Sequence, residues 1–454
     1  MKKIIISGAG EVGFHLAKWL SEENQEVTII DLDNEKLTRI KDQIDVQTIQ
    51  GSSISAQVLK EAGAENTDIL ISVTDSDETN MITSLVGSGH FNIPSKVARI
   101  RNQEFLNDKL ILGPNYLNID LVISPEKEVA DHILKIMQIP GAIDVISFEN
   151  DRILLIGYKI NEKSPLLNMS LKNIKQKVLI ISIVRDDKVI IPKGHDVILN
   201  NDKIFILTKR EELSQIQSLL KKEESIKRIM IIGASQISFN LAQSLENKGI
   251  EVKLVDSQKI KCYEMSEKLN KTIILHGDPT DINLLKEENI QDIDVFVGAS
   301  NDEGVNLLSS LLAKRFGVKK TIAIVNNYSY IPVSSSIGID VVLSPKLIAA
   351  SRILHFVREG VLTIKTLSDI KAEAFEIIAK PDWDIINKPL STIKFPQETL
   401  IGAIIRNEEI IIPTGKDFIY PNDRVIIFAL VKALKKIEKI LKVDFDKRSN
   451  IKTG

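Results

Sequence analysis

The sequence repeats itself after about 225 residues, and this repeat constrains the fold more than any other feature. Residues 4–20 (IIISGAGEVGFHLAKWL) match residues 229–245 (IMIIGASQISFNLAQSL). Shorter matches follow in the same order: 26–31 with 251–256, 69–81 with 295–307, and 121–125 with 341–345. We call these two matching segments A and A′.

A second kind of unit, B, follows each A segment. Residues 188–194 (KVIIPKG) match residues 409–415 (EIIIPTG), and residues 201–207 match residues 422–428. The chain therefore has the order A–B–A′–B′. Its length of 454 residues is too great for one ordinary core and suits several domains.

The A units have the pattern of an α/β fold, because short apolar strands alternate with amphipathic helices. In the first unit we expect strands at 3–7, 26–31, 46–50, 68–74, 96–101 and 119–124. The connections suit right-handed crossovers, so we predict a Rossmann-like, doubly wound parallel sheet. Turns after residues 7, 31 and 74 then open on one edge of that sheet. The B units have short strands separated by Pro-Lys-Gly and Asn-Asp turns, which predicts small α+β domains.

These patterns divide the chain into seven segments. They are a first Rossmann-like domain (1–125), a linker helix (126–140), a first α+β domain (141–224), a second Rossmann-like domain (225–345), a second linker helix (346–359), a second α+β domain (360–443) and a basic tail (444–454). The tail region also carries acids, so a solvated helix end is favoured there over contact with lipid or a membrane protein.

Composition excludes several classes of function. The net charge of −2 gives no reason to expect a nucleic-acid-binding protein. A single cysteine, Cys262, excludes an internal disulfide and fits a reducing compartment. The apolar runs have strand length and fall short of the ~20 residues that cross a bilayer. We therefore expect a protein of the cytosol.

Gly8, Gly10 and Gly13 form a complete G-x-G-x-x-G motif between an apolar strand and a helix. In this context Gly8 allows a tight turn, Gly10 lets a pyrophosphate approach the backbone, and Gly13 allows close packing of helix and strand. The helix N-terminus favours an anion. Asp31 ends the next strand, where it accepts ribose hydroxyls and repels a 2′-phosphate, which favours NAD(H) or an adenine nucleotide over NADP(H). The alternative is a glycine turn with a structural role alone.

Two polar clusters fall near the same sheet edge. Residues 74–80 (TDSDETN) follow the fourth expected strand, where ligands of such sheets bind, although Asp and Ser there are also common as helix caps. Arg99 and Arg101 alternate along the fifth expected strand and therefore share one face. A phosphate or an acidic partner surface explains this pair, and so does exposure to solvent at a sheet edge.

Catalytic and metal-binding patterns are missing from the sequence. The histidines have no zinc-ligand spacing, and there is no nucleophile elbow or Walker lysine. We therefore predict no catalytic residues, no metal and a binding module. The alternative is an NAD-dependent oxidoreductase with its substrate site between the Rossmann-like and C-terminal domains.

The motifs closely resemble the TrkA family of peripheral, nucleotide-binding subunits of bacterial Trk potassium uptake systems. The resemblance rests on GAGEVG (8–13), Asp31, residues 59–81, ARIRN (98–102) and LVISPE (121–126), and it covers all but the tail. It implies two RCK-N domains, each followed by an RCK-C domain. It also implies NAD(H), ATP or ADP as ligands, a TrkH-type membrane subunit as partner, a tetrameric ring at the inner face of the membrane, and gating of potassium flux.

The resemblance also implies the site residues. They are Gly8, Gly10, Glu11, Val12 and Gly13 at the phosphate turn, Asp31 at the ribose, Thr74, Asp75 and Glu78 at the pocket rim, and Arg99 or Arg101 at a phosphate or a neighbouring subunit. The family often has Gly-Asp or Gly-Asn near the adenine. The first copy departs from this with Gly51-Ser52-Ser53, whereas the second copy keeps Gly277-Asp278.

The second copy keeps Gly233 and Asp256, but Ser235 and Ser238 replace its other two glycines. Serine forced into the left-handed region costs ~1–2 kcal/mol, and its side chain fills space that a pyrophosphate needs. We expect dinucleotide binding there to be at least ~10-fold weaker. A smaller ligand held by Asp256 and Asp278 is the alternative. For the B units, binding a ligand and pairing subunits both remain open.

Overall fold

The structure is a computed structural model that describes residues 1–174, 178–186, 188–220, 226–327, 329–331, 333, 337–357, 361–367 and 372–441. The chain divides into two compact units. Unit 1 holds Met1–Glu128 together with Pro345–Val361, and unit 2 holds Val129–Ser344 together with Leu362–Val443. The predicted tail at 444–454 lies outside the described residues. The predicted domain boundaries stay predictions.

Unit 1 contains a six-stranded sheet in the order β3-β2-β1-β4-β5-β6, and every neighbouring pair is parallel. Its elements are β1 (Lys3–Ser7), α1 (Glu11–Glu22), β2 (Glu26–Asp31), α2 (Asn34–Gln43), β3 (Gln47–Gln50), α3 (Ala56–Glu61), β4 (Ile69–Ser72), α4 (Asp77–Gly89), β5 (Ser95–Arg99), α5 (Gln103–Asn107), α6 (Lys109–Leu112), β6 (Leu121–Ile123) and the start of α7 (Pro125–Gln138). The predicted Rossmann-like sheet is confirmed.

Successive side chains of each strand point to opposite faces of the sheet, so alternate residues belong to two hydrophobic layers. Ile4 and Ile6 face α1 and α2, whereas Ile5 and Leu70 face α3 and α4. The carboxyl ends of the parallel strands lie on one edge, which carries the turns after β1, β2 and β4. One detail of the prediction is wrong: β5 ends at Arg99, so Arg101 lies in the following loop and does not share the strand.

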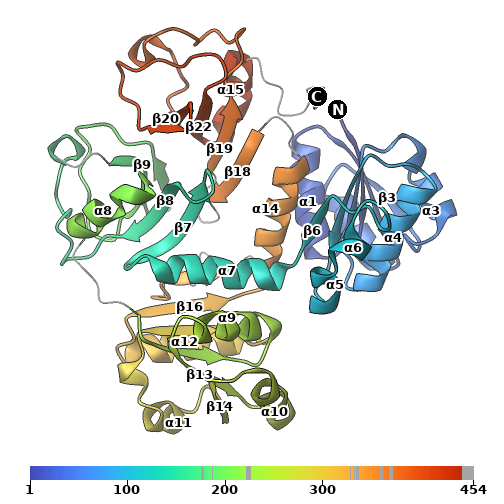
Figure 1. Ribbon diagram of the computed structural model, residues 1–454, viewed down its shortest axis with the longest axis horizontal. Coiled ribbons are helices and arrows are strands. Elements are labelled where there is room, and N and C mark those ends of the chain that lie inside the picture. Colours follow the sequence, from blue (N-terminus) through green and yellow to red (C-terminus); the bar gives the residue numbers. More distant parts are fainter. Residues whose placement is uncertain are drawn as a thin grey trace. The chain divides into compact units, whose positions relative to one another are not determined.

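The second linker helix, α14 (Pro345–Val357), covers the first Rossmann-like domain. Its Ala349, Ala350 and Ile353 belong to the same core as Leu16 and Leu20 of α1 (Figure 1). Small residues allow the two helices to approach closely. The sequence predicts this helix but not its packing partner, which lies more than 300 positions earlier in the chain.

Unit 2 contains the second Rossmann-like sheet, in the order β14-β13-β12-β15-β16-β17, which repeats the first. Its elements are β12 (Arg228–Ile232), α9 (Gln236–Glu246), β13 (Glu251–Asp256), α10 (Lys259–Lys268), β14 (Ile273–His276), α11 (Ile282–Glu287), β15 (Val295–Gly298), α12 (Glu303–Arg315), β16 (Lys320–Ile324) and β17 (Val341–Leu343). All recorded strand pairs in this sheet are parallel.

The two B units form five-stranded sheets, β10-β9-β11-β8-β7 and β18-β19-β22-β20-β21, whose recorded pairs are antiparallel. The first has β7 (Ala142–Phe148), β8 (Ile153–Lys159), β9 (Leu179–Arg185), β10 (Lys188–Ile190), β11 (Lys203–Lys209) and α8 (Leu213–Leu219). The second has β18 (Val361–Leu367), β19 (Ala372–Ile378), β20 (Thr399–Arg406), β21 (Glu409–Ile411), β22 (Arg424–Leu430) and α15 (Leu434–Leu441). Short 3-10 turns lie at Ala64–Asn66, Leu171–Asn173, Arg210–Glu212, Ile290–Asp292, Leu390–Thr392 and Val431–Ala433.

The two B sheets share one hydrophobic core within unit 2. Phe205 and Leu207 of the first sheet pack in the same cluster as Ala374 and Phe428 of the second. The B units therefore pair with each other inside one chain.

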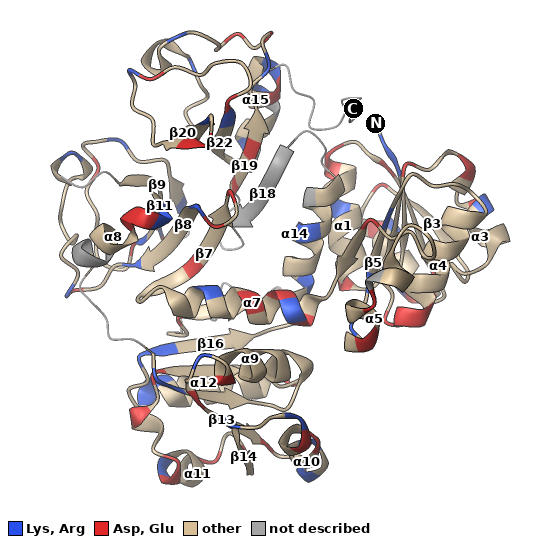
Figure 2. Cartoon of the chain, in the orientation of Figure 1, with Lys and Arg blue, Asp and Glu red and all other residues tan. Residues whose placement is uncertain are grey.

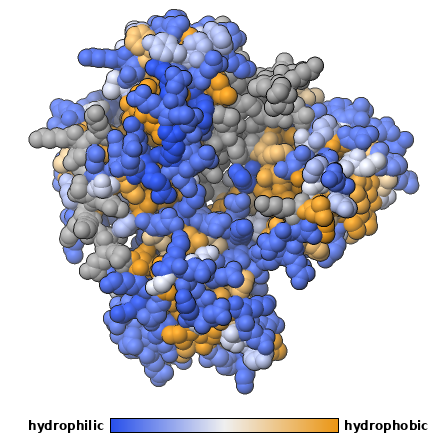
Figure 3. Space-filling model, in the orientation of Figure 1, coloured by the Kyte–Doolittle hydropathy of each residue, from blue (hydrophilic) through white to orange (hydrophobic). Residues whose placement is uncertain are grey.

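None of the helices in the described part of the chain combines the length and apolar character of a membrane span. Hydrophilic residues cover most of the surface seen in Figure 3, with scattered hydrophobic residues between them.

Candidate functional site

The turn from Gly8 to Gly13 joins β1 to α1 and requires glycine for two different reasons. Gly8 has a φ of +109°, and a Cβ there would lie 2.9 Å from the backbone N of Thr74. A Cβ on Gly13 would lie 1.9 Å from the carbonyl oxygen of Gly8. Side chains at these two positions conflict with the fold itself.

Gly10 is different, because the fold does not require it. Its backbone is extended, with a φ of −66°, and a Cβ there would meet nothing within 4 Å. Gly10 is also the N-cap of α1, and no side chain caps this helix end. The turn therefore leaves open space in front of an uncapped helix N-terminus, which is the arrangement that binds phosphate groups.

The other residues of the turn contribute in different ways. Val12 is 5% exposed, so its contribution to a ligand is limited to the backbone. The Glu11 carboxylate faces Arg39, at 3.0 Å, and His15, at 3.9 Å. Burial, the largest influence, lowers the pKa of His15, although Glu11 acts in the opposite direction. The Glu11 side chain is thus bound to its own domain.

Asp31, at the end of β2, supports the turn. Its Oδ2 accepts a hydrogen bond of 2.6 Å from the backbone N–H of Ala9, and its Oδ1 accepts one of 2.9 Å from Asp33. The residue is only half-buried. Each carboxylate oxygen can accept more than one hydrogen bond, so Asp31 can still accept from a ribose.

The rim residues 74–80 form the turn before α4 and its first residues. Asn80 Oδ1 accepts hydrogen bonds from the Thr74 N–H, at 2.9 Å, and from the Thr74 hydroxyl, at 2.7 Å. Its Nδ2 donates to the carbonyl oxygens of Thr74 and Arg99, at 3.1 and 2.9 Å. Ser76 is the N-cap of α4, as the capping alternative predicts. A hydrogen bond from its own backbone N–H, followed by one from the Ser76 hydroxyl, lowers the pKa of the exposed Glu78 carboxyl.

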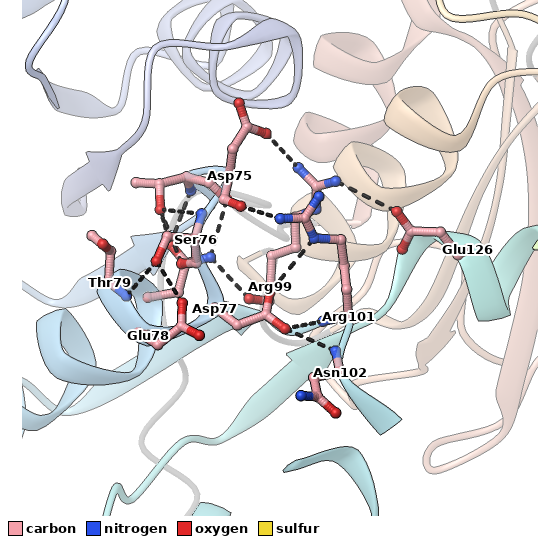
Figure 4. A network of polar contacts seen from close by, with 11 residues as sticks. Asp75, Ser76, Asp77, Glu78, Thr79, Arg99, Arg101, Asn102 and Glu126 are labelled. Carbon is pink, nitrogen blue, oxygen red and sulfur yellow. Dashed lines mark hydrogen bonds and ion pairs between the residues drawn. The ribbon is translucent and has the colours of Figure 1, made fainter. Parts of the chain in front are cut away.

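Both predicted arginines take part in one polar network at the rim (Figure 4). Arg99 Nη1 lies 3.3 Å from Asp75 Oδ1, and Arg99 Nη2 lies 3.5 Å from Oε1 of Glu126, in the first turn of α7. Arg101 donates to the carbonyl oxygen of Asp75 and lies 3.6 Å from Asp77 Oδ1. The network therefore joins the rim to the start of α7.

Sequence reasoning did not assign roles to Asp77 and Asn80. Asp77 Oδ2 accepts hydrogen bonds of 2.8 Å from the backbone N–H groups of both Arg101 and Asn102, so it fixes the loop after β5. The repeat itself contains the signal, because the second copy has Glu303 and Asn306 at these positions. Glu303 accepts from Asn326 and Asn327 in the same way, at 2.8 and 2.9 Å.

The loop after β3 has Ser52 where the second copy has Asp278. Ser53 is buried, and its hydroxyl joins those of Ser7, at 2.6 Å, and Thr83, at 2.9 Å. In the second copy, the exposed Asp278 accepts from the N–H and the hydroxyl of Thr280, at 2.8 and 2.7 Å. These two bonds, the backbone one first, lower the pKa of Asp278. The first loop is thus fixed by bonds to β1 and α4, and the second by bonds within the loop itself.

The second copy fills the space that the first leaves open. Ser235 caps α9 by accepting from the Ser238 N–H at 3.3 Å, and the two hydroxyls lie 3.1 Å apart. Ser235 has a φ of −98°, so the predicted left-handed strain is wrong, because this position is extended in both copies. Gly233 keeps the positive φ, at +93°. Asp256 is 7% exposed and accepts from Ala234 at 2.6 Å.

Among the described residues, no group of three His, Cys, Asp or Glu side chains could hold a metal ion. The one cysteine, Cys262, is buried, and burial is the main cause of its raised pKa.

Comparisons with known proteins agree with the repeat. The TrkA-N domain family matches residues 4–125 and 229–345, and the TrkA-C domain family matches residues 149–221 and 374–442. The chain is 34% identical over 452 residues to the Trk system potassium uptake protein TrkA of Halomonas elongata, covering 97% of this chain and 99% of that one. It is 36% identical over 451 residues to the protein of the same name from Haemophilus influenzae, covering 96% and 98%.

Two solved structures share the fold over most of the chain. The RCK domain of GsuK has a TM-score of 0.61 at 17% identity and covers 97% of this chain and 95% of that one. The GsuK channel bound to NAD has a TM-score of 0.61 at 16% identity, with 97% and 79% covered.

Proposed function

The chain belongs to the TrkA family of Trk potassium uptake proteins, and from this premise we propose that its first Rossmann-like domain binds NAD(H), ATP or ADP and thereby gates potassium flux through a TrkH-type membrane subunit. The family consists of non-enzymatic regulatory subunits, so the oxidoreductase alternative is wrong. In this proposal the protein forms a ring, expected to be a tetramer, at the inner face of the membrane.

The observation that carries the nucleotide proposal is the difference between the two copies of the turn. In the first copy the helix N-terminus is uncapped and the space at Gly10 is open. In the second copy Ser235 caps the helix, and its hydroxyl lies against that of Ser238. The N–H groups that would bind a phosphate are therefore available in the first copy and partly satisfied in the second.

The charged residues at the rim also differ between the copies, and this difference again favours the first copy as the nucleotide site. Residues that hold the backbone are retained, as the correspondence of Asp77 with Glu303 and of Asn80 with Asn306 illustrates. The residues that would meet a ligand are not retained: Asp75, Arg99 and Arg101 correspond to Asn301, Ile324 and Asn326. We infer that the second copy keeps the fold and that one nucleotide binds per chain.

Each predicted site residue has a place in this proposal. The backbone N–H groups of Glu11, Val12 and Gly13 would bind the phosphates in front of Gly10, with Gly8 shaping the turn. Asp31 would accept the ribose hydroxyls, Thr74, Asp75 and Glu78 would line the pocket rim, and Arg99 or Arg101 would meet a phosphate. NAD bound to GsuK, a channel with this fold, favours a dinucleotide as one of the ligands. The sequence assigns Gly233, Asp256 and Asp278 to a weaker second site, and in this proposal they serve the fold of the second copy.

The test uses Asp31→Asn and its matched control in the second copy, Asp256→Asn. We expect the wild type to bind NADH at least ~10-fold more tightly than NADPH, because two negative charges close together repel. In Asp31→Asn this preference should fall towards unity, and in Asp256→Asn it should not change. Isothermal titration of each protein with both dinucleotides measures the ratio. An unchanged preference in Asp31→Asn, or an equal loss in the control, contradicts the assignment.

A further inference from the structure

The Arg99 side chain connects the rim of the nucleotide site to the helix that leaves unit 1. One of its terminal nitrogens lies 3.3 Å from Asp75, which is 90% exposed at the rim. The other lies 3.5 Å from Glu126, which is 19% exposed in the first turn of α7 (Figure 4). One guanidinium therefore faces both the expected ligand and the start of α7.

This ion pair leaves hydrogen-bonding capacity unused on both sides. The separation of 3.5 Å between Arg99 Nη2 and Glu126 Oε1 exceeds a normal hydrogen bond of ~2.7–3.2 Å. Within the described residues, Arg99 Nε and Glu126 Oε2 are buried and have no hydrogen-bond partner. Since an unsatisfied buried polar atom is costly, a phosphate that meets the guanidinium well would compete with Glu126.

Helix α7 continues from unit 1, which ends this part of the chain at Glu128, into unit 2, which begins at Val129. Its first turn carries a second acid, Glu128, whose Oε1 lies 3.9 Å from Nε of Arg352. Figure 2 shows acidic and basic residues along this helix. The two acids of the first turn thus face different arginines, of which one belongs to the nucleotide rim.

The repeat shows that both partners of the pair are lost together. In the second copy Ile324 stands at the position of Arg99, and Lys346 stands at the position of Glu126. Both charges are replaced in the second copy, where Ser235 also caps the helix at the phosphate turn. This ion pair is therefore associated with ligand binding and not with the fold.

We propose that Arg99 exchanges anionic partners: it pairs with Glu126 when the site is empty and with a nucleotide phosphate when the site is filled, so that binding releases the first turn of α7. This inference rests on the proposed nucleotide site and adds the route by which its occupancy reaches the rest of the chain. By thermodynamic linkage, the Glu126 carboxylate weakens nucleotide binding because it holds Arg99 away from the phosphate.

The direct test is to remove the competitor. Glu126→Gln should bind ADP about three- to tenfold more tightly than the wild type, and Arg99→Gln should bind it more weakly. In an Arg99→Gln background, Glu126→Gln should have no further effect. The matched control Glu128→Gln, which faces Arg352, should keep the wild-type affinity. Adenosine, which lacks a phosphate, should bind wild type and Glu126→Gln equally.

Amide hydrogen exchange gives the second readout. ADP should speed exchange at residues 127–131 in the wild type, and in Glu126→Gln exchange there should be faster before ADP is added and insensitive to it. Thermal unfolding of each variant checks that it is folded.

The outcomes separate the two proposals. If the wild type binds neither ADP nor NADH, the nucleotide site itself is wrong. If the wild type binds ADP but Glu126→Gln leaves its affinity unchanged or lower, the exchange of partners is wrong and the site stands. An equal gain in affinity for adenosine and for ADP in Glu126→Gln also overturns the exchange of partners, because such a gain would not depend on the phosphate.

Discussion

Replacing Gly10 by alanine should separate nucleotide binding from folding. The backbone at Gly10 suits any residue, and a Cβ there meets nothing within 4 Å. Alanine is a poorer N-cap than glycine, which costs up to ~1 kcal/mol, but it reduces the entropy of the unfolded chain, which gains ~0.4–1 kcal/mol. The two effects nearly cancel, so we expect the stability of the domain to stay within ~1 kcal/mol of the wild type.

The methyl group would nevertheless occupy the space that we assign to a phosphate, so affinity for ADP should fall at least ~10-fold, or ~1.4 kcal/mol. Gly13→Ala is the contrasting variant. Its Cβ would lie 1.9 Å from the Gly8 oxygen, so the turn must open by about 1 Å. Overpacking of this kind costs ~1–3 kcal/mol, and Gly13→Ala should therefore lose both stability and binding.

The assay follows unfolding in denaturant through Trp19, which packs against the core of the first domain. A Trp383→Phe background removes the signal from the other tryptophan, and titration with ADP measures binding. If Gly10→Ala binds ADP as well as the wild type does, the phosphate does not lie in front of Gly10, and the reasoning is refuted.

Two further predictions concern unit 2. The buried Glu246 carboxylate accepts from the N–H groups of Lys271 and Thr272, both at 2.8 Å, so Glu246→Ala should lower the free energy of unfolding by ~1–3 kcal/mol. Burial raises the pKa of the Glu246 carboxyl, but the hydrogen bonds together outweigh burial, so its pKa is lowered. The difference in the free energy of unfolding between the wild type and Glu246→Ala should therefore be fully present above pH ~4.5 and shrink as the pH falls. Arg406 holds the buried Asp423 carboxylate through bonds of 2.9 and 2.7 Å, so Arg406→Met should cost ~3 kcal/mol, measured by unfolding followed through Trp383.

Each of these predictions has its own check. A stability difference for Glu246→Ala that grows as the pH falls contradicts the assigned sign. For Arg406, the repeat supplies the control: Arg185 holds Asp202 through bonds of 2.8 and 2.7 Å, so Arg185→Met should lose stability to a similar extent. Unchanged unfolding in both variants would show that these buried pairs do not support the B units.

The sequence predicts the strands of the first sheet well where apolar runs end at polar residues. The predicted strands 3–7 and 26–31 coincide with β1 and β2. The prediction extends too far at 96–101, because Asp77 holds the backbone of Arg101 in a loop. Period-two patterning cannot detect such a contact, since a distant side chain makes it.

Long-range packing accounts for what the sequence did not reveal. The small residues of α14 suit close packing, but nothing in their pattern identifies α1 as the partner. The motif does indicate a separate role for each of its three glycines, but not the backbone geometry behind each role. The positive φ of Gly8, the close contact of Gly13 and the open space at Gly10 are properties of the folded backbone. The strain predicted at Ser235 was wrong because the backbone at this position is extended in both copies.

The central claim is that one copy of the repeat binds a nucleotide and the other completes the fold. Equilibrium dialysis of the full chain against ADP and against NADH, with protein concentration fixed by absorbance, tests it most directly. We expect saturation at one nucleotide per chain, shifted to at least ~10-fold higher nucleotide concentration in Gly10→Ala and unchanged in Asp256→Asn. Saturation at two nucleotides per chain, or binding that is lost in Asp256→Asn and kept in Gly10→Ala, would contradict the account.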